Sequence, residues 1–518
     1  CQHYLKWFYE HPKEKTEANC YVDTEGNLRL TTHLKRQVLL DNIFGVDLDQ
    51  QAVQVTMLSL YLKILEGETR STLGRQHLLF PKESFLPDLS GNIMQGNSLI
   101  EGDYLDLFAD GDEVRRIKPF DWHTEFRGIM KVGGFDAALG NPPYVFGEYL
   151  DPKQKRYLET HYDTAVGQYD LYHLFFERAL KLLKPKGFHG YVVPDAILAR
   201  DETARLRRIL LGQHFVVRRI FHAGQSFEKV NVSVAVVISQ RAEDPSAHVT
   251  VDESTHANRP VAVRNLPVHA FRDDPLARFF IALTSSGFAL VRKLQASPGR
   301  LRDFGSFSRG EELGKKHLGR ARRLKRGYGW ILVGEDVERF HVKPPSFVVR
   351  RSHISKSPEI YAAPKLVIVK TGDRPVAALE RKGYWTMQSL YNVCMQAASD
   401  VEPQILLCLI NSSLLAWYLS RTVTAYKKMF PQFNQDHFED LPIADTTTWD
   451  KRKCQKLVQL ANRMEEFALR RHRARSDSER QTVESTIRAA NRSINELVYD
   501  LYGLTKDEIA LVEQSLPD

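Results

Sequence analysis

The first half of the chain alternates short apolar runs with amphipathic helical patterns, and this alternation limits the fold more than any other feature. Asn42–Asp47 reads as a buried strand, and an amphipathic helix is predicted over Gln51–Leu65. Phe135–Leu139 is a second strand of this kind, and a helix over Asp170–Leu183 is predicted to stop at the Pro/Gly break of residues 184–187. Strands that alternate with helices are typical of a parallel sheet covered by helices, so we expect an α/β fold.

The pattern changes twice along the chain. The α/β pattern closes near Ser239, and polar sequence over Ala242–Pro260 is predicted to be a linker or a connecting loop. An irregular α+β pattern follows to about Ile443. Lys451–Arg475 and Gln481–Tyr502 are long, charged helical patterns, which predict a helical hairpin. We therefore expect three domains, over residues 1–255, 256–445 and 446–518.

Composition narrows the class of protein. With 43% hydrophobic and 26% charged residues, the chain has the composition of a soluble globular protein. The longest apolar stretch falls short of the roughly 18 residues of a membrane span, so we expect no membrane association. Five cysteines without a CxxC pair indicate neither a disulfide framework nor a metal site, and the cytosol is the expected compartment. Because residue 1 is cysteine in a tract that reads as mid-helix, we expect a fragment or processed piece.

The tetrad Asn141-Pro142-Pro143-Tyr144 follows a predicted strand and Gly140. Ligands of open α/β sheets bind beyond the carboxyl ends of the strands. An amine on an aromatic ring is a poor nucleophile because its lone pair is delocalised into the ring. The Asn141 side-chain oxygen and the Pro142 backbone oxygen would accept its N–H bonds and stabilise positive charge developing on nitrogen. Tyr144 would stack on the aromatic ring that carries the amine. A plain Asn-Pro turn is the alternative reading.

Three motifs together carry a family resemblance: this tetrad, Gly45-Val46-Asp47-Leu48-Asp49, and Gly96-Asn97-Ser98-Leu99. They resemble those of gamma-class DNA adenine methyltransferases that use S-adenosylmethionine, and more closely the methyltransferase and specificity portion of type IIG restriction-modification enzymes. The resemblance implies a Rossmann-like doubly wound sheet over 1–255, a target-recognition domain over 256–445 and a helical spacer over 446–518. It also implies methyl transfer to the 6-amino group of a flipped adenine in double-stranded DNA, within a restriction-modification or related phage-defence system.

The resemblance assigns roles to individual residues. Asp47 would bind both ribose hydroxyls of the cofactor, and Leu48 would pack on its adenine. Asn97 would meet the adenine amino group; it stands where aspartate is common, but its carboxamide oxygen can also accept a hydrogen bond. Phe227, in Phe227-Glu228-Lys229-Val230-Asn231, resembles the aromatic residue that stacks on the flipped base. A core phenylalanine that opens a strand is the alternative for Phe227.

The sequence also departs from the family. The Gly-rich first motif, which holds the methionine part of the cofactor, is absent, and in relatives it lies just before a helix like Cys1–His11. We therefore expect that the sheet lacks its first strand and that this chain binds S-adenosylmethionine poorly or not at all. The resemblance further implies a nuclease domain upstream in the parent chain. Glu380-Arg381-Lys382, with Asp373 upstream, is a triplet of the nuclease type that is common by chance, and we expect no nuclease function from it.

The second half carries a basic run and further family motifs. Ala363–Ile368, Gly383–Ser389 and Leu409–Ser412 follow the order seen in type IIG specificity domains. The chain has 72 Lys and Arg against 64 Asp and Glu, a modest excess that suits a polyanionic partner. The run that we expect to contact DNA phosphates, as opposed to forming a solvated loop, holds Lys315, Lys316, Arg320, Arg322, Arg323, Lys325 and Arg326.

Three alternative functions remain open at this level. A methyltransferase that acts on the glutamine amide of a protein also uses an Asn-Pro-Pro-Tyr loop, although it would not need a basic second half. An adenine methyltransferase acting on structured RNA is another alternative. The third is a non-catalytic DNA-recognition fragment whose activity depends on upstream sequence.

Overall fold

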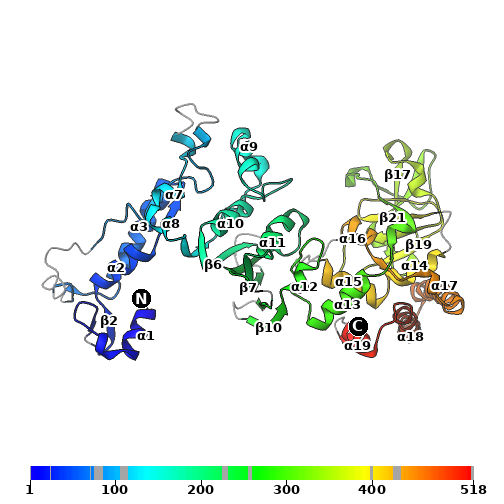
Figure 1. The fold of residues 1–518 in the computed structure, drawn as a ribbon. Coiled ribbons are helices and arrows are strands. Elements are labelled where there is room, and N and C mark those ends of the chain that lie inside the picture. Colours follow the sequence, from blue (N-terminus) through cyan, green and yellow to red (C-terminus); the bar gives the residue numbers. More distant parts are fainter. Residues whose placement is uncertain are drawn as a thin grey trace. The chain divides into compact units, whose positions relative to one another are not determined.

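The protein is described here by a computed structural model. It covers the chain except for residues 1, 24, 71, 75–85, 106–114, 225–231, 245, 255–259, 397–400, 424–432 and 515–518. The chain divides into two compact units: residues 1–191 with 240–242, and residues 192–239 with 243–518. Figure 1 shows their helices and strands, coloured along the sequence. Each unit has its own clusters of buried apolar side chains.

The first unit begins with α1 (Gln2–Glu10), the hairpin of β1 (Cys20–Val22) and β2 (Leu28–Leu30), and α2 (Thr32–Asn42). Next come β3 (Gly45–Asp47) and α3 (Gln50–Leu65), which confirm the strand and helix predicted there. Asp49 begins α3 because its carboxylate accepts a hydrogen bond from the N–H of Gln51. β4 (Ile93–Gln95) pairs in parallel with β3. Parallel pairing brings the carboxyl ends of both strands to the same edge.

A second parallel pair follows in the same unit. β5 (Phe135–Gly140) pairs with β6 (Leu183–Pro194), and α10 (Leu171–Lys181) precedes β6. The break predicted at residues 184–187 was wrong in one respect, because these residues belong to β6. Lys186 has a φ of 67°, so a local irregularity inside the strand stands where the sequence predicts a stop. α7 (Trp122–Glu125), α8 (Arg127–Lys131) and α9 (Pro152–His161) complete this part.

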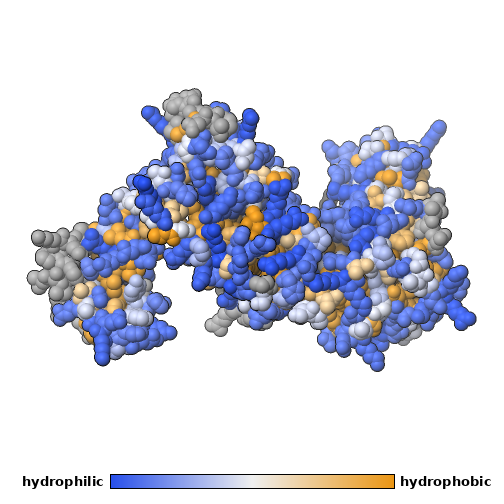
Figure 2. Space-filling view, viewed as in Figure 1, coloured by the Kyte–Doolittle hydropathy of each residue, from blue (hydrophilic) through white to orange (hydrophobic). Residues whose placement is uncertain are grey.

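The two parallel pairs do not form one continuous sheet among the residues that the structure describes. β3 and β4 make a two-stranded sheet, whereas β5 pairs with β6. Aromatic side chains pack between the two pairs, with the rings of Phe44 and Phe135 6.0 Å apart. Apolar side chains remain at the surface, among them Leu58 of α3 at 57% exposure and Leu139 of β5 at 80%; Figure 2 shows apolar residues at the surface over α3. The absence of a central strand from the whole fold stays a prediction.

The second unit includes η3 (Asp195–Leu198), η4 (Asp201–Thr203) and α11 (Ala204–Leu210), and it contains four neighbouring strands of a larger sheet in the order β10-β9-β7-β8. The linker predicted over Ala242–Pro260 was wrong, because β9 runs through it. Alternation of apolar and polar residues gives β9 its buried face, on which Val249 and Val251 are fully buried. The strands are β7 (Phe215–Gly224), β8 (Val234–Arg241), β9 (His248–Ser254) and β10 (Pro260–Pro267).

The irregular α+β region of this unit consists of two four-stranded sheets with the orders β12-β21-β18-β19 and β13-β17-β14-β20. α12 (His269–Arg272) and α13 (Ser285–Gln295) precede them. The strands of the first sheet are β12 (Gly305–Arg309), β18 (Lys365–Val369), β19 (Ala377–Glu380) and β21 (Leu390–Met395). Those of the second are β13 (Gly319–Arg320), β14 (Tyr328–Leu332), β17 (Phe347–Arg350) and β20 (Trp385–Thr386).

Helices complete the second unit. The predicted helical hairpin is confirmed by α17 (Lys451–Arg473) and α18 (Asp477–Leu501), and α19 (Lys506–Gln514) follows. The apolar stripe of α17, including Leu457 and Met464, is buried. No single described helix is long and apolar enough to cross a membrane; α14 (Pro403–Ile410) and α15 (Ser413–Thr422), which bend by 54°, meet the length and composition criteria only as a pair.

Candidate active site

The Asn141–Tyr144 loop leaves the carboxyl end of β5, where the sequence predicts a site. Asn141 is exposed, whereas the ring of Pro142 is buried and fixes the backbone between them. The Tyr144 hydroxyl donates a hydrogen bond of 2.9 Å to Asn141 Oδ1. The structure therefore brings the carboxamide, the proline carbonyl and the aromatic ring together in one loop.

Asp170 anchors this loop to α10, a role that sequence reasoning missed. Its carboxylate accepts a hydrogen bond of 2.9 Å from the N–H of Val145 and also caps α10 through the N–H of Tyr172. The N–H of Leu171 returns a bond of 2.8 Å to the Val145 carbonyl. The available signal was an aspartate directly before an apolar helical pattern, a typical N-cap. Burial raises the pKa of Asp170, against the lowering effect of these backbone hydrogen bonds.

Packing fixes the entry and exit of the loop. Gly140 lies so close to Tyr191 that a Cβ on it would come within 2.9 Å of the tyrosine ring, so a larger residue would displace β5 or the ring. The ring of Tyr144 meets that of Tyr172 edge to face at 6.2 Å. Burial, followed by the charge of Asp170, raises the pKa of Tyr144, so its hydroxyl stays protonated and able to donate.

The second predicted group, Asp47, Leu48 and Asn97, lies at the carboxyl ends of β3 and β4. The N–H of Gly96 donates 2.9 Å to the Asp47 carbonyl and joins the two strand ends. Asp47 Oδ1 accepts from the N–H of Asp49 at 2.8 Å, which orients the exposed carboxylate. Asn97 Oδ1 accepts from the N–H of Leu99 at 3.1 Å, and Leu48 is 48% exposed. The ends of these two strands thus carry two hydrogen-bond acceptors, Asp47 and Asn97, and the exposed apolar side chain of Leu48.

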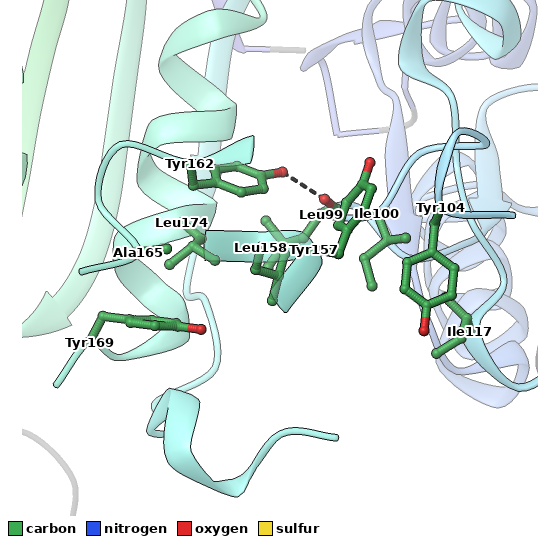
Figure 3. Close-up of a cluster of buried hydrophobic side chains, with 10 residues drawn as sticks. All are labelled: Leu99, Ile100, Tyr104, Ile117, Tyr157, Leu158, Tyr162, Ala165, Tyr169 and Leu174. Atoms are coloured by element: carbon green, nitrogen blue, oxygen red, sulfur yellow. Dashed lines mark hydrogen bonds between the residues drawn. The ribbon is translucent and has the colours of Figure 1, made fainter. Parts of the chain in front are cut away.

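A buried cluster holds the segment that follows Asn97 (Figure 3). The Tyr162 hydroxyl donates 2.8 Å to the Leu99 carbonyl, and the Tyr157 hydroxyl donates 2.5 Å to Asp103. Both tyrosines are almost fully buried beside Ile100. Hydrogen bonds from α9 and from the chain that follows it thus fix the loop after β4, and the sequence gives no periodic signal for these contacts.

Two further predictions concern the second unit. Phe227 lies outside the described residues. The basic run lies around β13 and in the connection to β14, where Lys316, Arg320, Arg322, Arg323, Lys325 and Arg326 are exposed; the structure does not describe the side chain of Lys315. Glu380, of the nuclease-type triplet, is buried, and its carboxylate accepts a bond of 2.6 Å from Lys365 Nζ. In the described part of the chain, no group of three or more His, Cys, Asp and Glu side chains is arranged to hold a metal ion.

Comparison with protein families defines the class of protein to which these features belong. The Eco57I restriction-modification methylase family matches residues 41–227, which include the Asn141 loop. The TaqI-like C-terminal specificity domain matches residues 330–443, which include the second sheet of the α+β region from β14 onward. Residues 41–227 are thus similar to Eco57I-like restriction-modification methylases, and residues 330–443 are similar to TaqI-like specificity domains.

Individual relatives agree with this class. The chain is 33% identical over 214 residues to the type II restriction enzyme and methyltransferase RM.Eco57I of Escherichia coli, a match that covers 40% of this chain but 19% of that protein. It is 23% identical over 322 residues to the type II methyltransferase M.TthHB8I of Thermus thermophilus, which covers 60% of this chain and 72% of that one. The chain thus corresponds to a small part of the length of RM.Eco57I.

A solved structure supports the fold. The type IIL restriction-modification enzyme MmeI, determined in complex with DNA, matches with a TM-score of 0.55 and 13% identity. The match covers 92% of this chain and 73% of that one. The likeness therefore includes residues of both units. At 13% sequence identity it shows similarity of fold and nothing about function.

Proposed function

We propose that this chain is the methyltransferase and specificity portion of an enzyme that transfers a methyl group from S-adenosylmethionine to the 6-amino group of adenine in double-stranded DNA, within a restriction-modification or related system. The observation that carries the proposal is the loop at the end of β5, where the exposed Asn141 carboxamide and the Pro142 backbone lie beside the ring of Tyr144. The matches to the methylase and specificity families support it.

The loop would act by polarising the amine. Asn141 Oδ1 and the Pro142 carbonyl would accept the two N–H bonds of the amino group, so that its lone pair turns toward the methyl donor. Tyr144, and in this proposal Phe227, would hold the base after it leaves the duplex, because a paired adenine cannot reach a methyl donor. The amine can lose its proton after alkylation, so no nearby general base is required.

The acceptors at the ends of β3 and β4 suit the cofactor. When bound, S-adenosylmethionine supplies an electrophilic methyl group. The oriented Asp47 carboxylate would accept hydrogen bonds from the ribose hydroxyls, exposed Leu48 would cover the adenine, and Asn97 would meet its amino group. The proposed domains are 1–255 for catalysis, 256–445 for target recognition and 446–518 as a helical spacer.

A second candidate is a DNA-recognition fragment that needs upstream sequence for activity. The separation of the β3–β4 pair from the β5–β6 pair favours it, because a continuous methyltransferase sheet would join them. In this reading the chain alone binds S-adenosylmethionine poorly, and isothermal titration calorimetry that finds micromolar binding would reject it.

One assay identifies the molecule that accepts the methyl group. The experiment uses the parent protein, by which we mean the longer protein of which we expect this chain to be a fragment. It is incubated with labelled S-adenosylmethionine and, in parallel, with duplex DNA, duplex RNA or a release-factor protein. We expect label only in DNA, and digestion of that DNA should yield N6-methyladenine. Label in RNA or protein would favour the alternatives, and methylated cytosine would contradict the adenine assignment.

A further inference from the structure

Two segments of the second unit concentrate positive charge. Residues 313–334 and 339–358 hold seven and five Lys and Arg residues and no Asp or Glu, whereas the whole chain has 72 basic against 64 acidic residues. The two segments pair with each other, because β13 and β14 both run antiparallel to β17. Six of these cations therefore lie in one small sheet and in the connection between two of its strands: Arg320, Arg322, Arg323, Lys325, Arg326 and Arg350.

The connection between β13 and β14 crosses β17. Arg320 of β13 lies opposite Phe347 at one end of β17, and Tyr328 of β14 lies opposite Arg350 at the other end. Residues 321–327 must pass from one side of β17 to the other, and the N–H of Arg351 binds the Gly327 carbonyl at 2.9 Å. The connection carries four exposed cations, Arg322, Arg323, Lys325 and Arg326.

Two arginines of this sheet, and a third that directly follows β17, lie against aromatic rings. The guanidinium carbon of Arg350 is 5.7 Å from the centre of the Tyr328 ring, and that of Arg351 is 6.0 Å from the Trp385 ring. Arg320 stands 5.4 Å from the ring of Phe347. A guanidinium held against a ring loses less conformational freedom on binding than a free one, so these side chains are partly preorganised.

Arg350 is the most constrained of the three. Its Nε donates a hydrogen bond of 2.7 Å to the Tyr328 hydroxyl, which fixes the plane of the guanidinium. Within the part of the chain that the structure describes, its two Nη atoms donate no hydrogen bond, and the residue is exposed. Two N–H groups side by side match the N7 and O6 acceptors of guanine in the major groove, so their contact with a base would select a sequence. Their contact with a phosphate would select none, because all phosphates of the duplex are alike.

We propose that Arg350 and Arg351 read base edges in the major groove of duplex DNA, whereas the four cations of residues 321–327 contact phosphates. This assignment rests on the proposed function, since it requires that the chain recognises DNA. β-Strands are known to enter the major groove in other DNA-binding proteins, and β17 is short enough to present one or two side chains there.

The test compares three variants of the parent protein on a random duplex DNA library. Arg350→Lys keeps the charge but removes the fork, Arg322→Ala/Arg323→Ala removes phosphate contacts, and Arg480→Lys on the exposed side of α18 is the matched control. We expect Arg350→Lys to relax the preference at one base pair by about tenfold or more, with the salt dependence unchanged. The double variant should weaken binding to all sequences and reduce the salt slope by about two.

Three outcomes would overturn the assignment. Arg350→Lys could retain the full preference, or the double variant could lose the preference at one base pair only. The third outcome is that duplex RNA binds as well as duplex DNA, because protein side chains cannot read the deep, narrow major groove of RNA. If the unaltered parent binds no DNA, the proposed function fails as well. If the parent selects a sequence and Arg350→Lys selects the same one, only this inference fails.

Discussion

The hydroxyl of Tyr144 donates a hydrogen bond of 2.9 Å to Asn141 Oδ1, so the two side chains that we assign to the target base already bind each other. An amide oxygen has two lone pairs, so the bond leaves one for an incoming N–H. It also fixes which end of the carboxamide faces the loop. Tyr144 is therefore a positioning residue through its hydroxyl as well as a stacking residue through its ring.

Tyr144→Phe separates these two roles. Because the ring stays and one neutral hydrogen bond of about 0.5–1.5 kcal/mol is lost, we expect methyl transfer by the parent to slow by about two- to tenfold in kcat. Tyr144→Ala should in addition raise KM for DNA, since stacking is lost. A phenylalanine variant as impaired as the alanine variant would contradict a separate role for the ring.

Asp47→Ala tests the cofactor group. Hydrogen bonds to a charged acceptor are worth about 1.5–3 kcal/mol each, so the variant should raise the dissociation constant for S-adenosylmethionine by on the order of tenfold or more. Asp41→Ala, a change at an exposed carboxylate of α2, is the matched control. Calorimetry on the parent protein makes the measurement, and unchanged affinity would remove Asp47 from the site.

His189 makes the first unit sensitive to acid. Burial lowers its pKa to about 3, and neither ring nitrogen has a partner among the described residues. Between pH 6.5, the ordinary pKa of histidine, and about pH 3, His189 is protonated in the unfolded chain but not in the folded chain. The free energy of unfolding therefore falls as the pH drops from 6.5 toward 3. Denaturation at pH 7.5 and 5.5 should show a smaller loss for His189→Leu than for the unaltered protein. His3→Gln, at an exposed histidine of α1 in the same unit, is the matched control for removal of an imidazole.

Lys365 and Glu380 form a buried ion pair that we assign to the fold of the specificity domain. Their side chains are 0% and 1% exposed, and burial lowers the pKa of Lys365 against the opposing effect of Glu380. Lys365→Met should cost about 3–5 kcal/mol, because the buried Glu380 carboxylate loses its cation and keeps only the N–H groups of residues 382–384, and Lys365→Met/Glu380→Leu should recover part of the loss. Chemical denaturation of the three proteins measures both values. A double variant less stable than Lys365→Met would contradict this reading.

The sequence predicted what depends on local pattern. The strand ending at Gly140, α3, α17 and α18 were predicted to within a few residues, because apolar periodicity and capping residues mark them. β9 was missed because a short alternating strand among polar residues resembles a loop until its partners β7 and β10 are known. Asp170 and Tyr162 were missed for the same reason, since their roles depend on contacts between segments distant in sequence.

The central claim is that the Asn141 carboxamide and the Pro142 carbonyl activate the amine, and Asn141→Ala in the intact parent tests it most directly. The measurement is the initial rate of tritium transfer from labelled S-adenosylmethionine to duplex DNA under saturating substrate. We predict a loss of about 10²–10³-fold in kcat, as for removal of one preorganised group from a reaction site, and a smaller loss for Asn141→Asp, which keeps an acceptor. An alanine variant that labels DNA at the unaltered rate would contradict the account.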